Sequence, residues 1–239
     1  MRLALVALAA AVLATAAGAQ TRATVFAAGS LADAFPKLAP TPRYSFAGSN
    51  QLAAQIRQGA PADVFAAANL KLPYGLFADG FCSRPVVFTR NALVLIVPRG
   101  NPARIRTVFD LRRKGVKLVI AAQGVPVGEY ALQVLRKLKL TAVLRNVVSR
   151  ETDVREVLAK VALGEADAGF VYLTDARTVP RKVRTFAIPP RGRPEIEYGI
   201  CVVLRNDKAA GRAFVKRVLG PTGQNALRSY GFLPRVKPR

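Results

Sequence analysis

The sequence contains no histidine and only two cysteines in 239 residues. Histidine is the most frequent general base and metal ligand, so its absence removes the commonest route to both kinds of chemistry. Two cysteines cannot form a structural zinc site alone, and neither has a histidine partner for nucleophilic catalysis. The patterns of a Walker A loop, a GxSxG elbow and a GxGxxG fingerprint are also missing. We therefore expect neither an enzyme nor a cofactor, although sequence alone does not exclude hydrolysis by paired carboxylates.

Acidic residues are scarce as well: 14 Asp and Glu stand against 37 Lys and Arg, giving a formal net charge of +23. Such a balance first suggests nucleic acid or an anionic surface as a partner. The basic residues are scattered, however, with only short groups such as Arg112-Arg113 and the tail 235–239. They predict a solvated basic surface that attracts small anions without selecting among them, and no nucleic-acid partner. An exported protein that binds polyanions remains the alternative.

The first twenty residues have the pattern of a secretory signal peptide. Arg2 precedes an apolar run from Leu3, and small residues stand at Ala17 and Ala19. We expect a signal peptide over 1–19, because the apolar run is short for a membrane anchor, and a soluble mature chain in the periplasm or otherwise outside the cytoplasm. In that compartment Cys82 and Cys201 can form a disulfide. The alternative is two buried free thiols.

Strand-like and helix-like segments alternate along the rest of the sequence. Residues 90–98 form a continuous aliphatic run that predicts a buried strand, and residues 128–138 have the spacing of an amphipathic helix. Thr152 is the expected N-cap of a helix over 155–163. This alternation predicts an α/β fold with mostly parallel sheets, in which ligands bind at the carboxyl ends of strands.

One local unit occurs twice near the start of the mature sequence: a β-prone run, then Gly-Ser, then the start of a helix. The copies are TVFAAGSLADAF, with Ser30, and YSFAGSNQLAAQI, with Ser49. Unpaired N–H groups and the helix dipole favour anions at such a point, and each serine is expected to be an N-cap. Neutral donors suit a fully deprotonated oxyanion, so molybdate, tungstate or sulfate is favoured over hydrogen phosphate.

Several separated segments resemble, in the same order, the periplasmic molybdate-binding proteins of ABC importers. They are VFAAGSLADAF, FAGSNQLAAQIRQGAPADVF, VPVGEY, TDVREVL, GFVYLTDA and GPTGQNALRSYGF. The resemblance implies that an oxyanion is held by neutral hydrogen bonds between two lobes. Ser30 and Ser49 would donate from the first lobe, Val127 and Val154 would donate backbone N–H groups, and Tyr172 its phenolic O–H. Position 127 is commonly alanine in that family, a change that keeps the backbone donor.

The resemblance also implies the two-lobed, type II periplasmic-binding-protein (Venus-flytrap) fold. Lobe I is expected over residues 21–86 and 200–239 and lobe II over 87–199, with crossings near 88–94 and 198–202. Closure about this hinge would enclose molybdate or tungstate and present a surface to a membrane permease. We expect a monomer.

Overall fold

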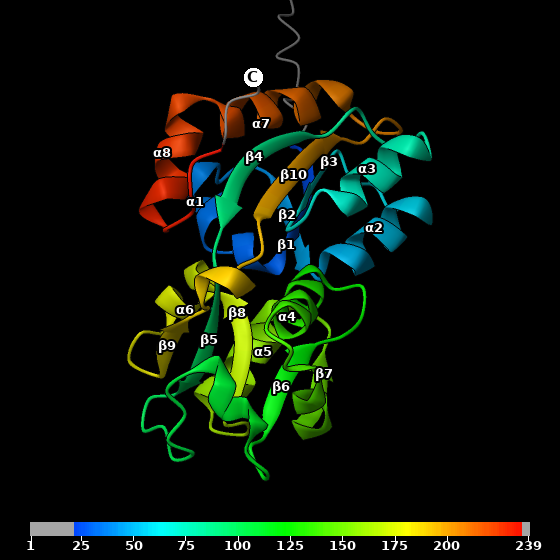
Figure 1. Ribbon diagram of the computed structural model, residues 1–239. Coiled ribbons are helices and arrows are strands. Elements are labelled where there is room, and N and C mark those ends of the chain that lie inside the picture. The colour runs from blue at the N-terminus through cyan, green and yellow to red at the C-terminus, as the bar shows by residue number, and fades with distance from the viewer. Residues whose placement is uncertain (1–21, 236–239) are drawn as a thin grey trace, which may run out of the picture.

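The computed structural model describes residues 22–235, so the predicted signal peptide over 1–19 lies outside the described residues. Within this part of the chain no helix is both long and apolar enough to cross a membrane. The described residues form two α/β lobes, one above the other in Figure 1, each built on a five-stranded sheet.

Lobe I contains the sheet with strand order β2-β1-β3-β10-β4. Its strands are β1 (Thr24–Ala28), β2 (Arg43–Ala47), β3 (Val64–Ala67), β4 (Val86–Asn91) and β10 (Ile196–Val202). Its helical segments are η1 (Gly29–Leu31), α1 (Ala34–Leu38), α2 (Ser49–Arg57), α3 (Lys71–Ala78), α7 (Lys208–Leu219) and α8 (Pro221–Ser229). The ring of Phe35 packs 5.9 Å from that of Phe88 and 5.4 Å from that of Phe214, which fastens α1 and α7 to the sheet.

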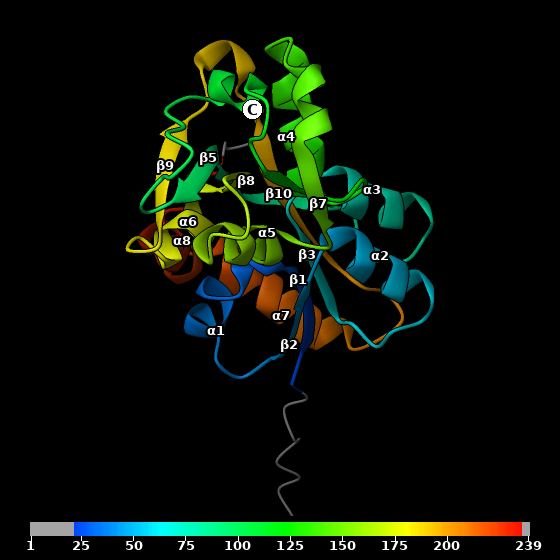
Figure 2. The same cartoon turned by 90° about the horizontal axis from the view of Figure 1, so that it is seen from below.

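Lobe II contains the sheet with strand order β7-β6-β8-β5-β9. Its strands are β5 (Leu93–Pro98), β6 (Leu118–Ala121), β7 (Val147–Glu151), β8 (Ala168–Tyr172) and β9 (Val183–Ala187). Its helical segments are η2 (Val108–Arg112), α4 (Pro126–Lys137), η3 (Thr141–Asn146), α5 (Val154–Ala162), α6 (Leu173–Thr178) and η4 (Pro190–Gly192). The view from below shows α4 and α5 on opposite sides of this sheet (Figure 2).

Both sheets are mixed, but four of the five strands in each run in the same direction, in line with the expectation of mostly parallel sheets. In lobe I, β1 is parallel to β2 and β3, whereas β10 is antiparallel to β3 and β4. In lobe II, β6 is parallel to β7 and β8, whereas β5 is antiparallel to β8 and β9. The reason is the path of the chain: β5 and β10 enter their sheets from the side of the other lobe, where the parallel strands end. They therefore run against those strands.

The two crossings between the lobes lie at Ala92, between β4 and β5, and in the segment between β9 and β10. The predicted boundaries at 86/87 and 199/200 instead cut β4 and β10. Both strands pair in the sheet of lobe I over their whole length, so this lobe extends to Asn91 and resumes at Ile196. The predicted single strand over 90–98 is likewise two strands, since the crossing interrupts it.

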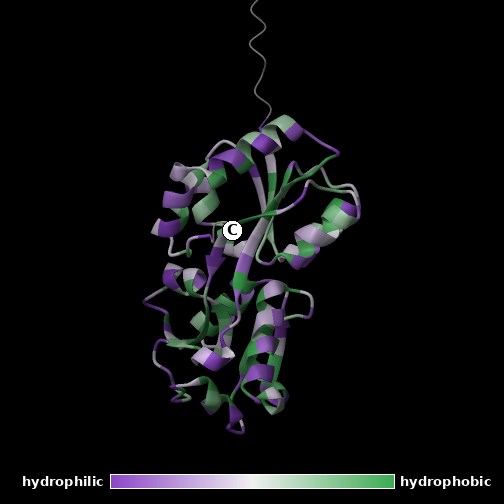
Figure 3. Ribbon diagram, turned by 45° about the horizontal axis from the view of Figure 1, so that its top comes forward, coloured by the Kyte–Doolittle hydropathy of each residue, from purple (hydrophilic) through white to green (hydrophobic). Residues whose placement is uncertain are grey.

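Apolar residues gather on the strands inside both lobes, whereas the outer helices mix hydrophilic and hydrophobic residues (Figure 3). Helix α4 shows how the sequence sets such an element. It begins at Pro126, two residues before the predicted start, because proline needs no hydrogen-bond acceptor for an N–H in the first turn. Val134 and Leu135 of this helix are fully buried. Burial of one face holds it on the sheet.

Cys82 and Cys201 are buried free thiols in the structure, so the disulfide is not formed in it. Both belong to the apolar cluster between the sheet of lobe I and helices α2 and α3. Cys82 pairs with Val203 in an isolated antiparallel bridge. Val203 lies two residues after Cys201, which belongs to β10. A hydrogen bond between the two thiols and their burial raise the pKa of Cys201. Of the two possibilities, a disulfide or two buried free thiols, the structure has the free thiols.

Candidate anion-binding site

Ser30 and Ser49 each follow strand β1 or β2 after one glycine, but neither is an N-cap as predicted. The N-caps are Ala28, two residues before Ser30, and Gly48, one residue before Ser49, and no side chain caps either helix. The serine hydroxyls are used elsewhere. Ser30 Oγ lies 2.9 Å from Tyr198 Oη, and Ser49 Oγ accepts the backbone N–H of Ala68 at 3.2 Å.

Val127 and Val154 lie in the first turns of α4 and α5, where N–H groups have no acceptor inside the helix. The N-cap of α5 is Asp153 rather than the predicted Thr152. Asp153 Oδ1 accepts the N–H groups of Arg155 at 2.6 Å and Glu156 at 3.1 Å. The carboxylate thus accepts hydrogen bonds from the N–H groups of the second and third residues of the helix. The N–H of Val154, the first residue, is outside this cap.

Tyr172 ends strand β8, and its side chain is buried. Its hydroxyl makes no hydrogen bond of ordinary distance and angle among the described residues, although the hydroxyl of Tyr198 is near enough to add to the effect of burial in raising its pKa. The rings of Tyr198 and Tyr130 lie 5.7 Å and 6.4 Å from its ring. Burial raises the pKa of Tyr172 well above its ordinary value, so the phenol stays protonated. A buried, unpaired O–H group is a costly feature unless a ligand uses it.

Contacts between the lobes bring these five positions to one junction. Arg155, next to Val154, donates from Nε to the carbonyl of Gly29, next to Ser30, at 3.2 Å. A Cβ on Gly48, next to Ser49, would lie 2.4 Å from the carbonyl oxygen of Thr152. Tyr198 connects the remaining pair, because it contacts Ser30 through its hydroxyl and Tyr172 through its ring. Gly124, in the loop before α4 and Val127, faces Asn50, the residue after Ser49.

Arg155 also carries the main charges at this junction. Its guanidinium pairs with Asp33 of lobe I and, at 3.2 Å from Nε to Oδ1, with Asp175 of lobe II. Asp175 is buried, and burial raises its pKa to about 7, although the positive charge of Arg155 opposes that shift. The arginine is therefore neutralised within the protein. The five predicted donors remain uncharged groups.

Four residues of this junction were not identified from the sequence: Asn91, Arg155, Asp175 and Tyr198. Arg155 and Asp175 stand inside the quoted segments TDVREVL and GFVYLTDA, but nothing local distinguishes them from ordinary helix residues. Tyr198 sits in the apolar strand β10, where an aromatic residue predicts only core. The pairing of Tyr198 with Ser30, 168 positions apart, has no sequence signal.

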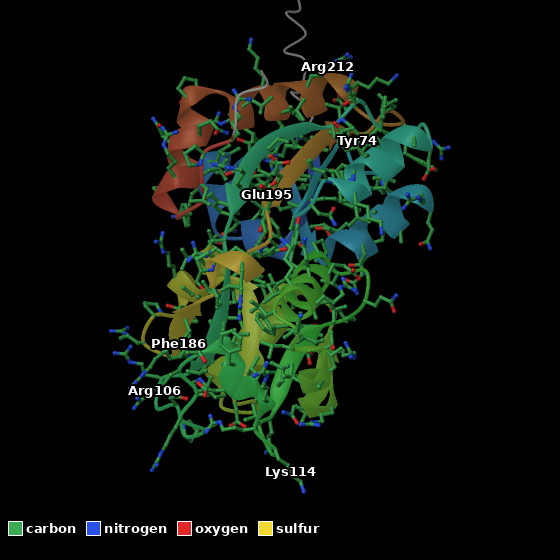
Figure 4. The ribbon with its side chains drawn as sticks, in the orientation of Figure 1. Tyr74, Arg106, Lys114, Phe186, Glu195 and Arg212 are labelled. Carbon is green, nitrogen blue, oxygen red and sulfur yellow. The ribbon has the colours of Figure 1, made fainter. Side chains whose placement is uncertain are left out.

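Several other positive charges lie away from this junction (Figure 4). Arg106 and Lys114 project from the far end of lobe II and Arg212 from α7 at the far end of lobe I (Figure 4). A hollow of about 1030 Å³ lies along α7 at the start of β1, lined in part by Arg22, Lys216 and Arg217. It is at the opposite end of the sheet from Ser30, which follows the carboxyl end of β1. Besides these basic residues, its lining includes the carboxylate of Asp207 and the side chains of Thr41 and Thr222.

Comparison with known proteins gives concordant results. A family model of the bacterial extracellular solute-binding proteins matches residues 23–233. The molybdate-binding protein ModA of Mycobacterium tuberculosis is 37% identical over 219 residues, which cover 87% of this chain and 83% of that protein. The substrate-binding domain of a putative molybdenum ABC transporter from Clostridium difficile is 28% identical, with a TM-score of 0.64 over 90% of this chain and 99% of that one. The periplasmic molybdate-binding protein of Azotobacter vinelandii, 23% identical, has the same fold, with a TM-score of 0.79 over 91% and 100%.

Proposed function

Because the chain belongs to the bacterial extracellular solute-binding proteins, with molybdate-binding proteins among its relatives, we propose that it captures molybdate or tungstate outside the cytoplasm and delivers it to an ABC importer. The family consists of binding proteins rather than enzymes. The proposed anion site is the junction of the two lobes. Its donors are the hydroxyls of Ser30, Ser49 and Tyr172 and the backbone N–H groups of Val127 and Val154.

The observation that carries this proposal is the unpaired hydroxyl of Tyr172, which is buried in contact with the residue that bonds Ser30. Desolvating a hydroxyl without a partner costs about 1–3 kcal/mol. An oxyanion between the lobes would supply the missing acceptor. The same anion would accept from the serine on the facing lobe, so binding favours the arrangement in which the lobes touch.

Neutral donors explain why the ligand would be an anion without a proton. Each of the five donates a hydrogen bond, and none of them is a carboxylate that accepts one. Hydrogen phosphate carries a proton at neutral pH, and wherever the hydroxyls of the site act as donors this proton is left unpaired, at a cost typical of a buried unsatisfied group. Molybdate, tungstate and sulfate lack that proton. Among these three anions, the dimensions of the closed site decide which one binds.

Thermal unfolding with each anion tests the proposal. A ligand that binds only the folded state at 100 times its Kd stabilises by about 2.7 kcal/mol, which is readily seen as a rise in Tm. We expect a large rise with molybdate and tungstate, and little with sulfate or phosphate. Tight, strongly salt-dependent binding of DNA with no response to molybdate would instead support a polyanion-binding protein.

Removing either serine hydroxyl is the first mutational prediction. We expect Ser30→Ala and Ser49→Ala each to weaken molybdate binding by about 1–3 kcal/mol, on the scale of a hydrogen bond to a charged group. Titration calorimetry measures this loss. Ser229→Ala is the matched control, because its hydroxyl donates to the carbonyl of Ala226 at the end of α8, away from the junction. Unchanged affinity in both site variants would rule out this site.

A further inference from the structure

The hydroxyl of Tyr198 connects the proposed site to the crossing between the lobes. Tyr198 is buried in β10, and its oxygen has two partners among the described residues: Ser30 Oγ at 2.9 Å and Asn91 Nδ2 at 3.3 Å. The rings of Phe88 and Phe232 pack edge-on against it at 6.0 Å and 5.7 Å. These contacts fix the ring, so the direction of its hydrogen bonds depends on the two polar partners.

The direction of the hydrogen bonds follows from a backbone donor. The N–H of Ala92 donates to Asn91 Oδ1 at 2.9 Å, and a backbone N–H can only donate. The oxygen of the amide is thereby assigned, and Nδ2 is the donor on the other side. Its two hydrogens point to Thr174 Oγ1, at 2.9 Å, and to Tyr198 Oη. The oxygen of Tyr198 is thus the acceptor in its bond with Asn91.

Two further oxygens among the described residues face the proton of Tyr198: Ser30 Oγ lies within hydrogen-bond distance at 2.9 Å, whereas Tyr172 Oη makes no hydrogen bond of ordinary distance and angle. Ser30 Oγ is therefore the acceptor for that proton. The phenol does not lose this proton near neutrality, because burial raises the pKa of Tyr198 well above its ordinary value. Ser30 consequently accepts from inside the protein, and its own proton is left for another acceptor. Ser49 Oγ likewise accepts a hydrogen bond from inside the protein, from the N–H of Ala68.

We propose that Asn91 and Tyr198 are positioning residues that hold the hydroxyl of Ser30 as an obligate donor, so that the site selects oxyanions without a proton. The inference rests on the proposed function. A serine hydroxyl that is free to rotate can accept as well as donate and can therefore satisfy the proton of hydrogen phosphate. The chain Ala92–Asn91–Tyr198–Ser30 occupies one of the two lone pairs of Ser30 Oγ, and the described residues offer no other acceptor for its proton, so that proton is directed to the anion. This chain begins at the crossing between the lobes, where the backbone of residues 91 and 92 leaves β4 for β5.

A double-mutant cycle of Tyr198→Phe and Ser30→Ala tests this role. In the wild-type background we expect Tyr198→Phe to weaken molybdate binding about tenfold, the size of one hydrogen bond of average strength. In the Ser30→Ala background we expect the same change to have almost no effect, because Tyr198 acts through that hydroxyl. A tyrosine that served only to pack the lobe would weaken binding equally in both backgrounds.

Competition by inorganic phosphate supplies the readout of selectivity. In Tyr198→Phe we expect the ratio of phosphate Kd to molybdate Kd to fall at least about tenfold, because Ser30 can then accept a proton. Tyr44→Phe is the matched control: this phenol donates to the carbonyls of Phe35 and Ala39, at 3.1 Å and 2.6 Å, away from the site. It should keep the wild-type ratio.

Three outcomes are distinguishable. The positioning role would be overturned by additive losses in the cycle, or by a Tyr198→Phe variant that keeps both molybdate affinity and phosphate rejection. Binding of molybdate by the wild-type protein would still leave the proposed function intact. Absence of molybdate binding by the wild-type protein would overturn both. A non-additive cycle together with a reduced phosphate ratio would establish the role.

Discussion

Gly48→Ala is expected to lower molybdate affinity at least about a hundredfold, because a Cβ at this position meets the facing lobe. In the structure that atom would lie 2.4 Å from the carbonyl oxygen of Thr152, a backbone atom of lobe II. The backbone of Gly48 has φ −58° and ψ 132°, which alanine adopts without strain. Within lobe I the new Cβ would also lie 2.9 Å from Asn50 Oδ1, but that atom ends a side chain that can move, whereas the Thr152 carbonyl is backbone. The substitution therefore opposes mainly the contact between the lobes.

The control for this prediction is Gly100→Ala, since a Cβ on Gly100 meets no atom within 4 Å. Calorimetric titration and thermal unfolding without ligand are both needed. We expect the Gly48 variant to lose affinity while its Tm in the absence of molybdate stays near that of the wild type. Wild-type affinity in this variant would show that the lobes need not approach as closely as the structure places them to hold the anion.

Asp175→Asn is expected to stabilise the protein at pH 8 by up to about 4 kcal/mol, since each unit of pKa shift is worth about 1.4 kcal/mol. Burial raises the pKa of Asp175 from 3.8 to about 7. A raised pKa in the folded state means that the protonated carboxyl is favoured by folding. That stability is fully present below pH 4 and is lost as the pH rises through 7.

Unfolding by denaturant between pH 4 and pH 8 measures this dependence. The gain from Asp175→Asn should grow as the pH rises and nearly vanish at pH 4. Asp110→Asn is a control of opposite sign, because the backbone N–H groups of Arg106 and Thr107 lower the pKa of Asp110. That substitution should destabilise near pH 7 and matter least at low pH. A gain from Asp175→Asn that did not vary with pH would contradict an ionising carboxyl at the junction.

Much of the fold was predictable because its determinants are local. The alternation of apolar strands and amphipathic helices gives an α/β chain, and Lys208–Leu219 forms the helix expected from its spacing. The direction of β10 was not predictable in the same way. A strand in isolation has the same pattern in either direction, and its antiparallel pairing depends on where the chain re-enters lobe I. The boundaries of the lobes shifted for the same reason.

The residues of the candidate site likewise differ in whether local sequence or long-range packing determines them. The repeated Gly-Ser unit predicted Ser30 and Ser49 from local sequence, whereas Val127, Val154 and Tyr172 were implied by the family resemblance; all five remain predicted donors. The residues that set their direction come from far along the chain: Tyr198 is 168 positions from Ser30, and Arg155 is 126 positions from Gly29. Such contacts depend on the packing of two lobes. Sequence patterns therefore supplied the candidate donors, but not the hydrogen-bond partners that surround them in the structure.

Binding of a molybdate anion between the lobes is tested most directly by locating the metal. Anomalous scattering from molybdenum, in crystals grown with molybdate, places the ion without reference to any expected site. We predict one dominant peak at the lobe junction, with the anion's oxygens within hydrogen-bond distance of Ser30, Ser49, Val127, Val154 and Tyr172. A dominant peak in the basic hollow beside α7, or no ordered molybdenum between the lobes, would contradict this account.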